Sequence, residues 1–232
     1  MTRVFFSVGF APSSGSAVTM FDPNDILDYW FPDDGHWETL EAHLAFWHHR
    51  MQGGADHDIL SRFGPVTLAA AQCELDHWAN EPKGRLALLI ALDQFSRSYW
   101  RDTPQSYGQD IKACRLAMEA LENGHYDALS HPWERQFHII AITHCEGPDH
   151  LARMDLALDL TKKNIASVPA QLAPMIDRAM EQVHRVRENI RVFGRHPHRN
   201  NILGRVSSQA EAAYIDKGEF PHQNRIEATT DP

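Results

Sequence analysis

The chain has 232 residues, of which 43% are hydrophobic, so it is long enough and apolar enough to bury a sizeable core. Its formal net charge is −9, and this acidic balance argues against a nucleic-acid binder and against attachment to an acidic membrane surface. No apolar run approaches the roughly 20 residues that a membrane helix requires.

The first twenty residues differ in pattern from the rest. An apolar stretch follows a basic residue, as in a secretory signal, but Gly9 interrupts it and no small-x-small cleavage site follows. We therefore expect a disordered tail over residues 1–20 and a single helical domain over residues 21–232. Met20 is an alternative start, because the periodic sequence begins directly after it.

Helix signals then follow one another along the chain. Asp22 and Pro23 begin the first helix, because aspartate caps a helix and proline suits its first turn. Gly194 is the expected stop of the longest helix. Further helices are predicted over residues 37–50, 65–80, 84–99, 104–123, 132–146, 149–165 and 172–193, with a short last helix after Ser207.

The helix over residues 84–99 is apolar nearly all round, which predicts a position at the centre of the fold. No run of β-branched residues alternates with period two, so no strand is expected. Helices separated by short breaks favour antiparallel helical pairs. The sequence therefore predicts an all-α fold.

The first unusual polar stretch lies on this central helix. Asp93, Gln94 and Arg97 interrupt its apolar sequence, and the acid precedes the base by four residues, the favourable order on a helix face. We expect these groups at the less covered end of the helix. An ordinary intrahelical ion pair is the alternative interpretation.

The second stretch is His144-Cys145-Glu146. His144 continues an apolar stripe at helical spacing, so its ring should point inward, and Glu146 follows where the helix ends. Both side chains therefore suit the wall of one cavity. The alternative is a hydrogen-bonded core histidine with no ligand.

The third stretch follows the longest helix and is the most basic. Six arginines but only one acid, Glu188, fall between residues 185 and 205. Arginine binds carboxylate or phosphate through two hydrogen bonds, so an anion site is one interpretation. The alternative is helix-dipole stabilisation followed by a polar turn. The candidate residues are Arg195, His198, Arg199, Asn200 and Arg205. We expect this loop to lie near Asp93–Arg97 and His144, with Asp93 and Glu146 as its acidic partners.

Other catalytic centres lack support. The three cysteines are widely spaced, so we expect free thiols in a reducing, cytoplasmic compartment. The histidines near residues 43–57 lack a persuasive ligand spacing and are interpreted as surface residues, so no metal or other cofactor is expected. No nucleophile signature is present.

These stretches together resemble a bacterial family known as domain of unknown function 924. The resemblance extends over residues 21–217 and rests on the sequence ILDYWF at residues 26–31, GRLAL running into LDQFSR at 84–97, HxE at 144–146, and GRxPHRN with LGR at 194–205. It implies an all-α fold similar to tetratricopeptide-repeat proteins and brings no reaction.

The sequence departs from the family pattern in three places. Cys145 replaces a usual serine, His196 replaces a common phenylalanine, and the residues after Glu146 lack the usual acidic, glutamine-containing stretch. Cys145 and His196 are therefore poor candidates for a shared mechanism.

Three functions remain open from the sequence. The first is binding of a small anionic ligand in a polar pocket formed by the three stretches. The second is an enzyme that uses the same pocket for acid–base chemistry. The third is a scaffold similar to tetratricopeptide-repeat proteins that binds a partner peptide or protein.

Overall fold

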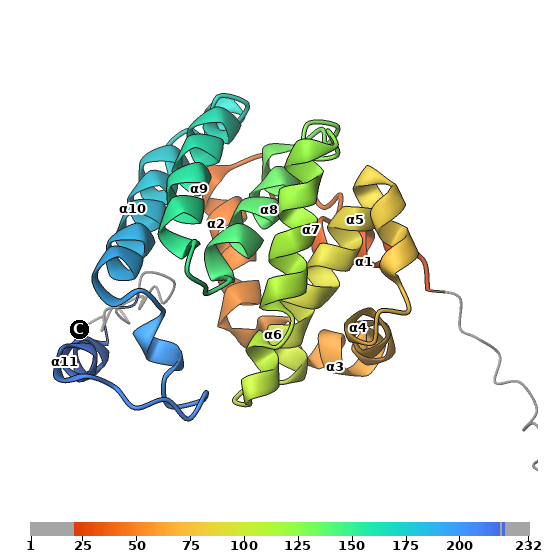
Figure 1. The fold of residues 1–232 in the computed structure, drawn as a ribbon. Helices are drawn as coiled ribbons and strands as arrows, with labels where there is room; N and C mark the ends of the chain where they lie inside the picture. Colours follow the sequence, from red (N-terminus) through yellow and green to blue (C-terminus); the bar gives the residue numbers. More distant parts are fainter. Residues whose placement is uncertain (1–20, 219, 221–232) are drawn as a thin grey trace, which may run out of the picture.

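The computed structural model describes residues 21–218 and residue 220 (Figure 1). The described residues contain no β-strand, which confirms the all-α prediction. The tail expected over residues 1–20 lies outside them. The helices are α1 Pro23–Trp30, α2 Leu40–His49, α3 Asp56–Arg62, α4 Gly64–Ala71, α5 Pro82–Ile90, α6 Ser96–Tyr99, α7 Asp110–Glu122, α8 Pro132–His144, α9 His150–Ile165, α10 Met175–Phe193 and α11 Gln209–Lys217.

Several helix ends follow directly from local chemistry. Asp22 Oδ1 accepts a hydrogen bond from the Asn24 amide at 2.8 Å and caps α1. Gly194 adopts φ +70°, the left-handed conformation that ends α10. Ser208 and Glu211 form a capping box at the start of α11. These three ends agree with the sequence-based prediction.

Other predicted helix bounds were wrong. α2 begins at Leu40 because the Thr39 hydroxyl caps it, accepting from the Ala42 amide at 3.2 Å. Thr103 does not cap the helix expected at 104–123, because its hydroxyl donates to the Trp100 carbonyl at 2.7 Å. A 3-10 turn follows over Pro104–Tyr107, and α7 begins only afterwards.

The helix expected over residues 65–80 also divides. α4 ends at Ala71, and Cys73 then adopts φ +65°, which breaks the helix. A short 3-10 helix, Asp76–Asn80, completes the segment. The helix α3 was not predicted from the sequence, because only Ile59 among its seven residues is buried and no apolar stripe marks it.

The predicted central helix is at the core of the protein. All seven residues from Gly84 to Ile90 are buried, and α5 packs against α1, α7 and α8. The helix then passes through a π-helical segment, Ala91–Phe95, before it continues as α6. π-helical turns are rare and are frequent at functional sites. This one carries Asp93 and Gln94.

Helices α7, α8, α9 and α10 form a side-by-side array in chain order (Figure 1). α8 lies between α7 and α9, so both of its flanks are covered. A likeness to tetratricopeptide-repeat packing stays a prediction. None of the described helices has the length and apolar composition needed to cross a membrane.

The histidine-rich segment differs from its prediction. His43 is only 4% exposed, so its interpretation as a surface residue was wrong. Its ring stacks with His36 at 5.3 Å and lies beside Trp47 and Trp133. Burial in this aromatic cluster and, to a smaller extent, the charge of His36 lower the pKa of His43 to about 4.

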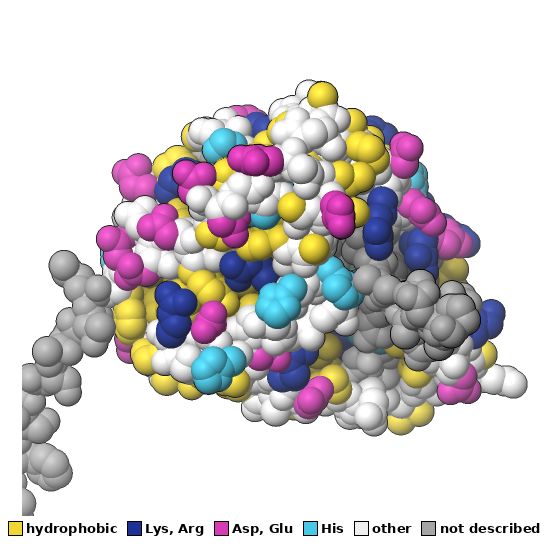
Figure 2. All heavy atoms as spheres, turned by 180° about the vertical axis from the view of Figure 1, so that it is seen from behind, with side chains coloured by type: hydrophobic (Ala, Val, Ile, Leu, Met, Phe, Trp, Pro, Cys, Tyr) yellow, Lys and Arg dark blue, Asp and Glu magenta, His cyan; other side chains and the backbone are white. Residues whose placement is uncertain are grey.

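The surface carries both signs of charge. On the face opposite to that in Figure 1, acidic, basic and hydrophobic side chains are interspersed, and no broad surface of one charge appears (Figure 2). The described residues on this face form no continuous basic stripe.

Candidate functional site

Asp93 is the most deeply buried charged residue of the candidate site. Its exposed fraction is 0%, so the expectation of a less covered helix end was wrong for Asp93, whereas the side chain of Arg97 is 21% exposed and agrees with it. The π-helical segment directs its carboxylate between α7 and α8. There it accepts hydrogen bonds from Gln94 Nε2 at 2.5 Å and from His144 Nδ1 at 2.8 Å. Such partners are what a buried carboxylate requires, because an isolated buried charge is very costly.

Asp93 and His144 form an oriented pair. His144 is the last residue of α8, and its side chain is 28% exposed. Its Nδ1 faces Asp93, whereas its Nε2 makes no hydrogen bond to the described residues. Burial acts to raise the pKa of Asp93, but the charge and hydrogen bond of His144 and the charge of Arg97 outweigh burial and lower that pKa to about 2.

Arg97 joins this pair to α7. Its Nη2 lies 3.4 Å from Asp93 Oδ1 and 2.6 Å from Asp110 Oδ1, and its Nη1 donates to the Ser106 carbonyl. The intrahelical ion pair with Asp93 is therefore present, but it is the longer of the two. Asp110 is the stronger partner, and the sequence analysis did not identify it.

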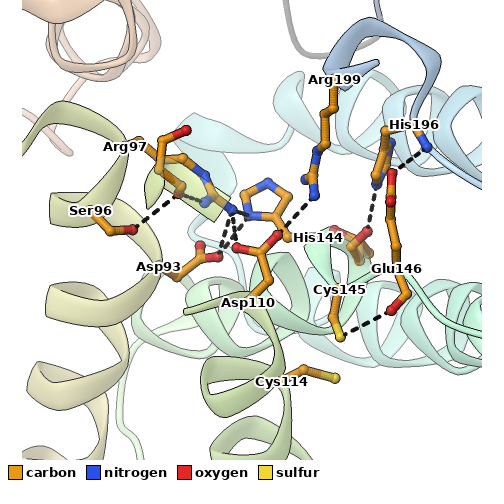
Figure 3. Close-up of polar contacts among 12 residues, drawn as sticks. Asp93, Ser96, Arg97, Asp110, Cys114, His144, Cys145, Glu146, His196 and Arg199 are labelled. Carbon is orange, nitrogen blue, oxygen red and sulfur yellow. Dashed lines mark hydrogen bonds and ion pairs between the residues drawn. The ribbon is translucent and has the colours of Figure 1, made fainter. Parts of the chain in front are cut away.

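Arg199 reaches the same carboxylate from the basic loop. Its Nη1 donates to Asp110 Oδ2 at 2.8 Å, so one carboxylate binds two guanidinium groups (Figure 3). Tyr107 covers both cations: the centre of its ring lies 4.8 Å from Arg97 Cζ and 4.4 Å from Arg199 Cζ. Arg199 is 4% exposed, and its buried Nε has no hydrogen-bond partner. Burial lowers the pKa of Arg199 despite the nearby charge of Asp110.

Glu146 anchors a second group of contacts beside the first. Its carboxylate accepts the backbone N–H of His196 at 2.7 Å and pairs with both terminal nitrogens of Arg205. Burial acts to raise the pKa of Glu146, but the hydrogen bonds from Arg205 and His196 lower it below its usual value. The basic loop is thus fastened to the end of α8 through Glu146 and to the start of α7 through Arg199.

The remaining loop residues lie elsewhere. Arg195 pairs with both oxygens of Glu211, at 2.6 and 2.9 Å, and so holds α11 rather than approaching Asp93. Its expected place near Asp93 was therefore wrong. Asn200 donates to Ser207 within the loop at 3.0 Å, and His198 lies between the rings of His196 and Phe220. Glu211 on the next helix is thus the acidic partner of Arg195, which the sequence analysis had expected to be Asp93 or Glu146.

Two cysteines also meet next to the site. Cys114 on α7 and Cys145 after α8 are both buried and free, and Cys145 Sγ donates to the Glu146 carbonyl at 3.6 Å (Figure 3). Arg153 Nη1 contacts Cys114 Sγ at 3.6 Å and the Cys145 carbonyl at 2.8 Å. The hydrogen bond from Cys114 lowers the pKa of Cys145 to about 7, although burial opposes that change. Cys145 is the more acidic thiol of the pair.

The three stretches singled out in the sequence thus contact one another, and their own side chains occupy the space between them. Asp93, Arg97, Asp110, His144 and Arg199 contact one another directly, and we call these five residues the polar network. A ligand would reach it at the partly exposed edges of Arg97 and His144, which are 21% and 28% exposed. Within the described part of the chain, no group of three or more metal-ligating side chains is assembled.

Comparison with known proteins identifies the family. The sequence profile described as bacterial protein of unknown function, DUF924, matches residues 26–219. The chain belongs to this family. A solved protein of unknown function from Agrobacterium tumefaciens is 31% identical, with a TM-score of 0.62 over 84% of this chain and 97% of that chain. No curated protein matches the sequence.

The DUF924 match includes the whole polar network and the Glu146 contacts. It begins at Ile26 and so includes most of α1 and the sequence ILDYWF at residues 26–31, one of the motifs that carried the resemblance. The DUF924 assignment therefore establishes kinship over the site, but it assigns no chemistry to it.

Proposed function

We propose that the polar network binds a small anionic molecule, such as a phosphate or a small carboxylate, at the edge formed by Arg97, His144 and Arg199. The observation that carries this proposal is the convergence of cationic donors on one spot. Two guanidinium groups share one carboxylate and one aromatic ring. The buried Nε of Arg199 lacks a hydrogen-bond partner, and His144 Nε2 makes no contact with a described polar group.

The balance of charge fits a ligand of this kind. Arg97 and Arg199 offset Asp93 and Asp110, so the network is neutral while His144 is neutral. The edge of the network that a ligand would meet presents the Arg97 guanidinium and the His144 imidazole, because the carboxylates of Asp93 and Asp110 are almost fully buried.

A thermal-shift experiment tests the proposal. Inorganic phosphate and succinate are compared with sodium chloride at equal ionic strength, because added salt alone changes surface electrostatics. A site that is occupied at about 100 times its Kd should raise the Tm by about 5–10 °C. The Arg199→Lys variant should lose most of this increment, because lysine keeps the charge but cannot reproduce the planar fork of arginine.

Arg195→Lys is the matched control. Arg195 belongs to the same loop but pairs with Glu211 outside the polar network, so its variant should respond to the anions as the parent does. Equal anion responses in the parent and Arg199→Lys, or no response beyond that to chloride in the parent, would contradict the proposal.

Acid–base catalysis is a second candidate, and the Asp93–His144 geometry favours it. A fully buried carboxylate orients an imidazole through Nδ1 and leaves Nε2 unbonded and partly exposed. This arrangement holds the imidazole in the tautomer that can accept a proton at Nε2. Bound anion and general base would then share one edge.

Hydrolysis of phosphate esters and carboxylic esters tests this second function. Turnover by the parent that is lost in His144→Asn, while anion-induced stabilisation persists, would support catalysis. Binding without any turnover of these esters would instead leave the site a binding site only.

The scaffold alternative is not favoured, because the large exposed hydrophobic side chains are spread over separate elements: Met51, Leu60, Leu68, Ile111, Val192 and Val206.

A further inference from the structure

A separate hollow lies against α1, which the polar network does not use. Its volume is about 580 Å³, within the range of small-molecule sites. It shares no residue with the polar network. The hollow is formed by α1, the residue after α2 and the end of α3, and its lining residues are Asp25, Asp28, Tyr29, Pro32, Arg50, Arg62 and Phe63.

The hollow has a cationic side built on aromatic rings. Arg50 Cζ lies 4.6 Å from the centre of the Tyr29 ring, and Arg50 Nη2 donates to the Tyr29 carbonyl at 2.8 Å. Arg50 Nε is buried without a hydrogen-bond partner. Arg62 Cζ lies 5.2 Å from the same ring, and its closest carboxylate, Asp58, is 4.0 Å away. Both guanidinium groups therefore have capacity for a further acceptor.

The α1 part of the lining adds two carboxylates. Asp25 and Asp28 lie three residues apart on α1, so they share a helix face, and both are exposed. Neither carboxylate forms an ion pair with the described residues. The helix dipole accounts for Asp25 in the first turn, but it disfavours Asp28 near the C-terminal end of the same helix. Asp28 thus occupies a position where its own helix does not stabilise it.

We infer that this hollow binds a small zwitterion of the amino-acid or dipeptide class. The carboxylate of the ligand would face Arg50 and Arg62, and its ammonium group would face Asp25 and Asp28. Apolar side chains of the ligand would lie over Tyr29 and Phe63. A ligand with a single charge would leave one of the two charged sides unmatched, whereas a zwitterion matches both.

Calorimetry with leucyl-leucine and its two blocked forms tests this inference. N-acetylation removes the cation and C-terminal amidation removes the anion, while the apolar side chains remain the same. Each blocked form should bind the parent at least about tenfold more weakly, because each loses charge-assisted hydrogen bonds. Absence of leucyl-leucine binding at about 10 mM, where even weak ligands are detected, would overturn the inference.

Two exposed residues allow a matched cycle. Asp28→Asn should weaken leucyl-leucine by at least about tenfold yet leave the N-acetylated form unaffected, because that form has no ammonium group to lose. Arg62→Gln should likewise weaken leucyl-leucine but leave the amidated form unaffected, because that form has no carboxylate to lose. Asp159→Asn, an exposed acid on α9, is the control and should bind as the parent does. Equal weakening of all three ligands by Asp28→Asn would exclude the assigned orientation.

This inference is independent of the proposed anion site. Arg199→Lys should bind leucyl-leucine as the parent does, and Asp28→Asn should keep its thermal response to phosphate. Displacement of leucyl-leucine by phosphate in the parent would mean that the hollow is a general anion site, which contradicts the zwitterion assignment.

Discussion

Asp110 Oδ2 lies 2.8 Å from Arg199 Nη1, although 89 residues separate the two along the chain. Both side chains are almost fully buried, at 8% and 5% exposure. The pair therefore ties the basic loop to the start of α7 in a place where water cannot replace either partner. Loss of one charge should be far more costly than loss of a surface pair.

Asp110→Asn should accordingly lower the free energy of unfolding by about 3–5 kcal/mol, because it leaves Arg97 and Arg199 without their shared counter-charge. Urea-induced unfolding measures this loss. Glu188→Gln is the control, since it removes an exposed partner of Arg191 on α10 and should leave the urea midpoint unchanged. Similar midpoints for both variants would mean that the buried pair does not stabilise the fold.

Asp93 should contribute to acid unfolding. Its pKa in the folded protein is about 2, below the usual 3.8, because His144 and Arg97 outweigh the effect of burial. Its contribution to stability is therefore fully present above pH 3.8 and is lost as the pH falls toward 2. The free energy of unfolding of Asp93→Asn should be lower at neutral pH and should depend less on pH in this window. An unchanged pH profile would contradict the assignment.

His138 should make stability depend on pH in a milder range. It is fully buried on α8, and burial lowers its pKa from the usual 6.5 to about 4. As the pH falls, His138 of the unfolded chain binds a proton before His138 of the folded chain does. The contribution of His138 to the free energy of unfolding is therefore complete above pH 6.5 and decreases by roughly 3 kcal/mol as the pH falls to 4. His138→Gln should flatten the profile over this range. Equal profiles for the parent and His138→Gln would exclude the effect.

Gly84 should be intolerant of even one methyl group. A Cβ at this position would lie 2.4 Å from the backbone carbonyl oxygen of Trp78, and a backbone group cannot turn aside as a side chain does. Gly84→Ala should therefore destabilise by about 1–3 kcal/mol, although alanine usually favours helices. Gly147→Ala is the comparison, because its Cβ would meet side-chain ends at 3.2 and 3.3 Å. An equal decrease of the Tm in Gly84→Ala and Gly147→Ala would contradict the view that the contact with the Trp78 backbone makes Gly84 intolerant.

Local signals predicted the helices well where a single residue decides the end. Asp22, Gly194 and the stretch after Ser207 needed only their own neighbours, so the sequence located them. The predicted helix bounds were wrong where a side chain bonds to a different partner. The Thr103 hydroxyl, for example, donates to the Trp100 carbonyl of the preceding turn. Spacing alone does not distinguish between a hydroxyl that caps a helix and one that closes the preceding turn.

The candidate site shows a different limit. Asp93 and His144 stood out because they interrupt apolar patterns, and Arg199 stood out because it lies in an arginine-rich loop; the structure does bring them into one network. Asp110 stood out in no such way, because an acid in the first turn of an amphipathic helix is ordinary. Its role depends on a contact 89 residues away, which no periodicity encodes. Glu211 was missed for the same reason, since a capping residue gives no sign of its second partner.

The π-helical segment Ala91–Phe95 sets the direction of the Asp93 carboxylate independently of the apolar contacts that α5 makes in the core. A π turn accommodates one more residue than an α turn, and the helix on either side keeps its facing. A single-residue deletion within it would therefore restore a regular helix and leave the apolar contacts of α5 in register. The same deletion would change where the Asp93 carboxylate points. Such a shortened chain would therefore keep its architecture while its polar network came apart.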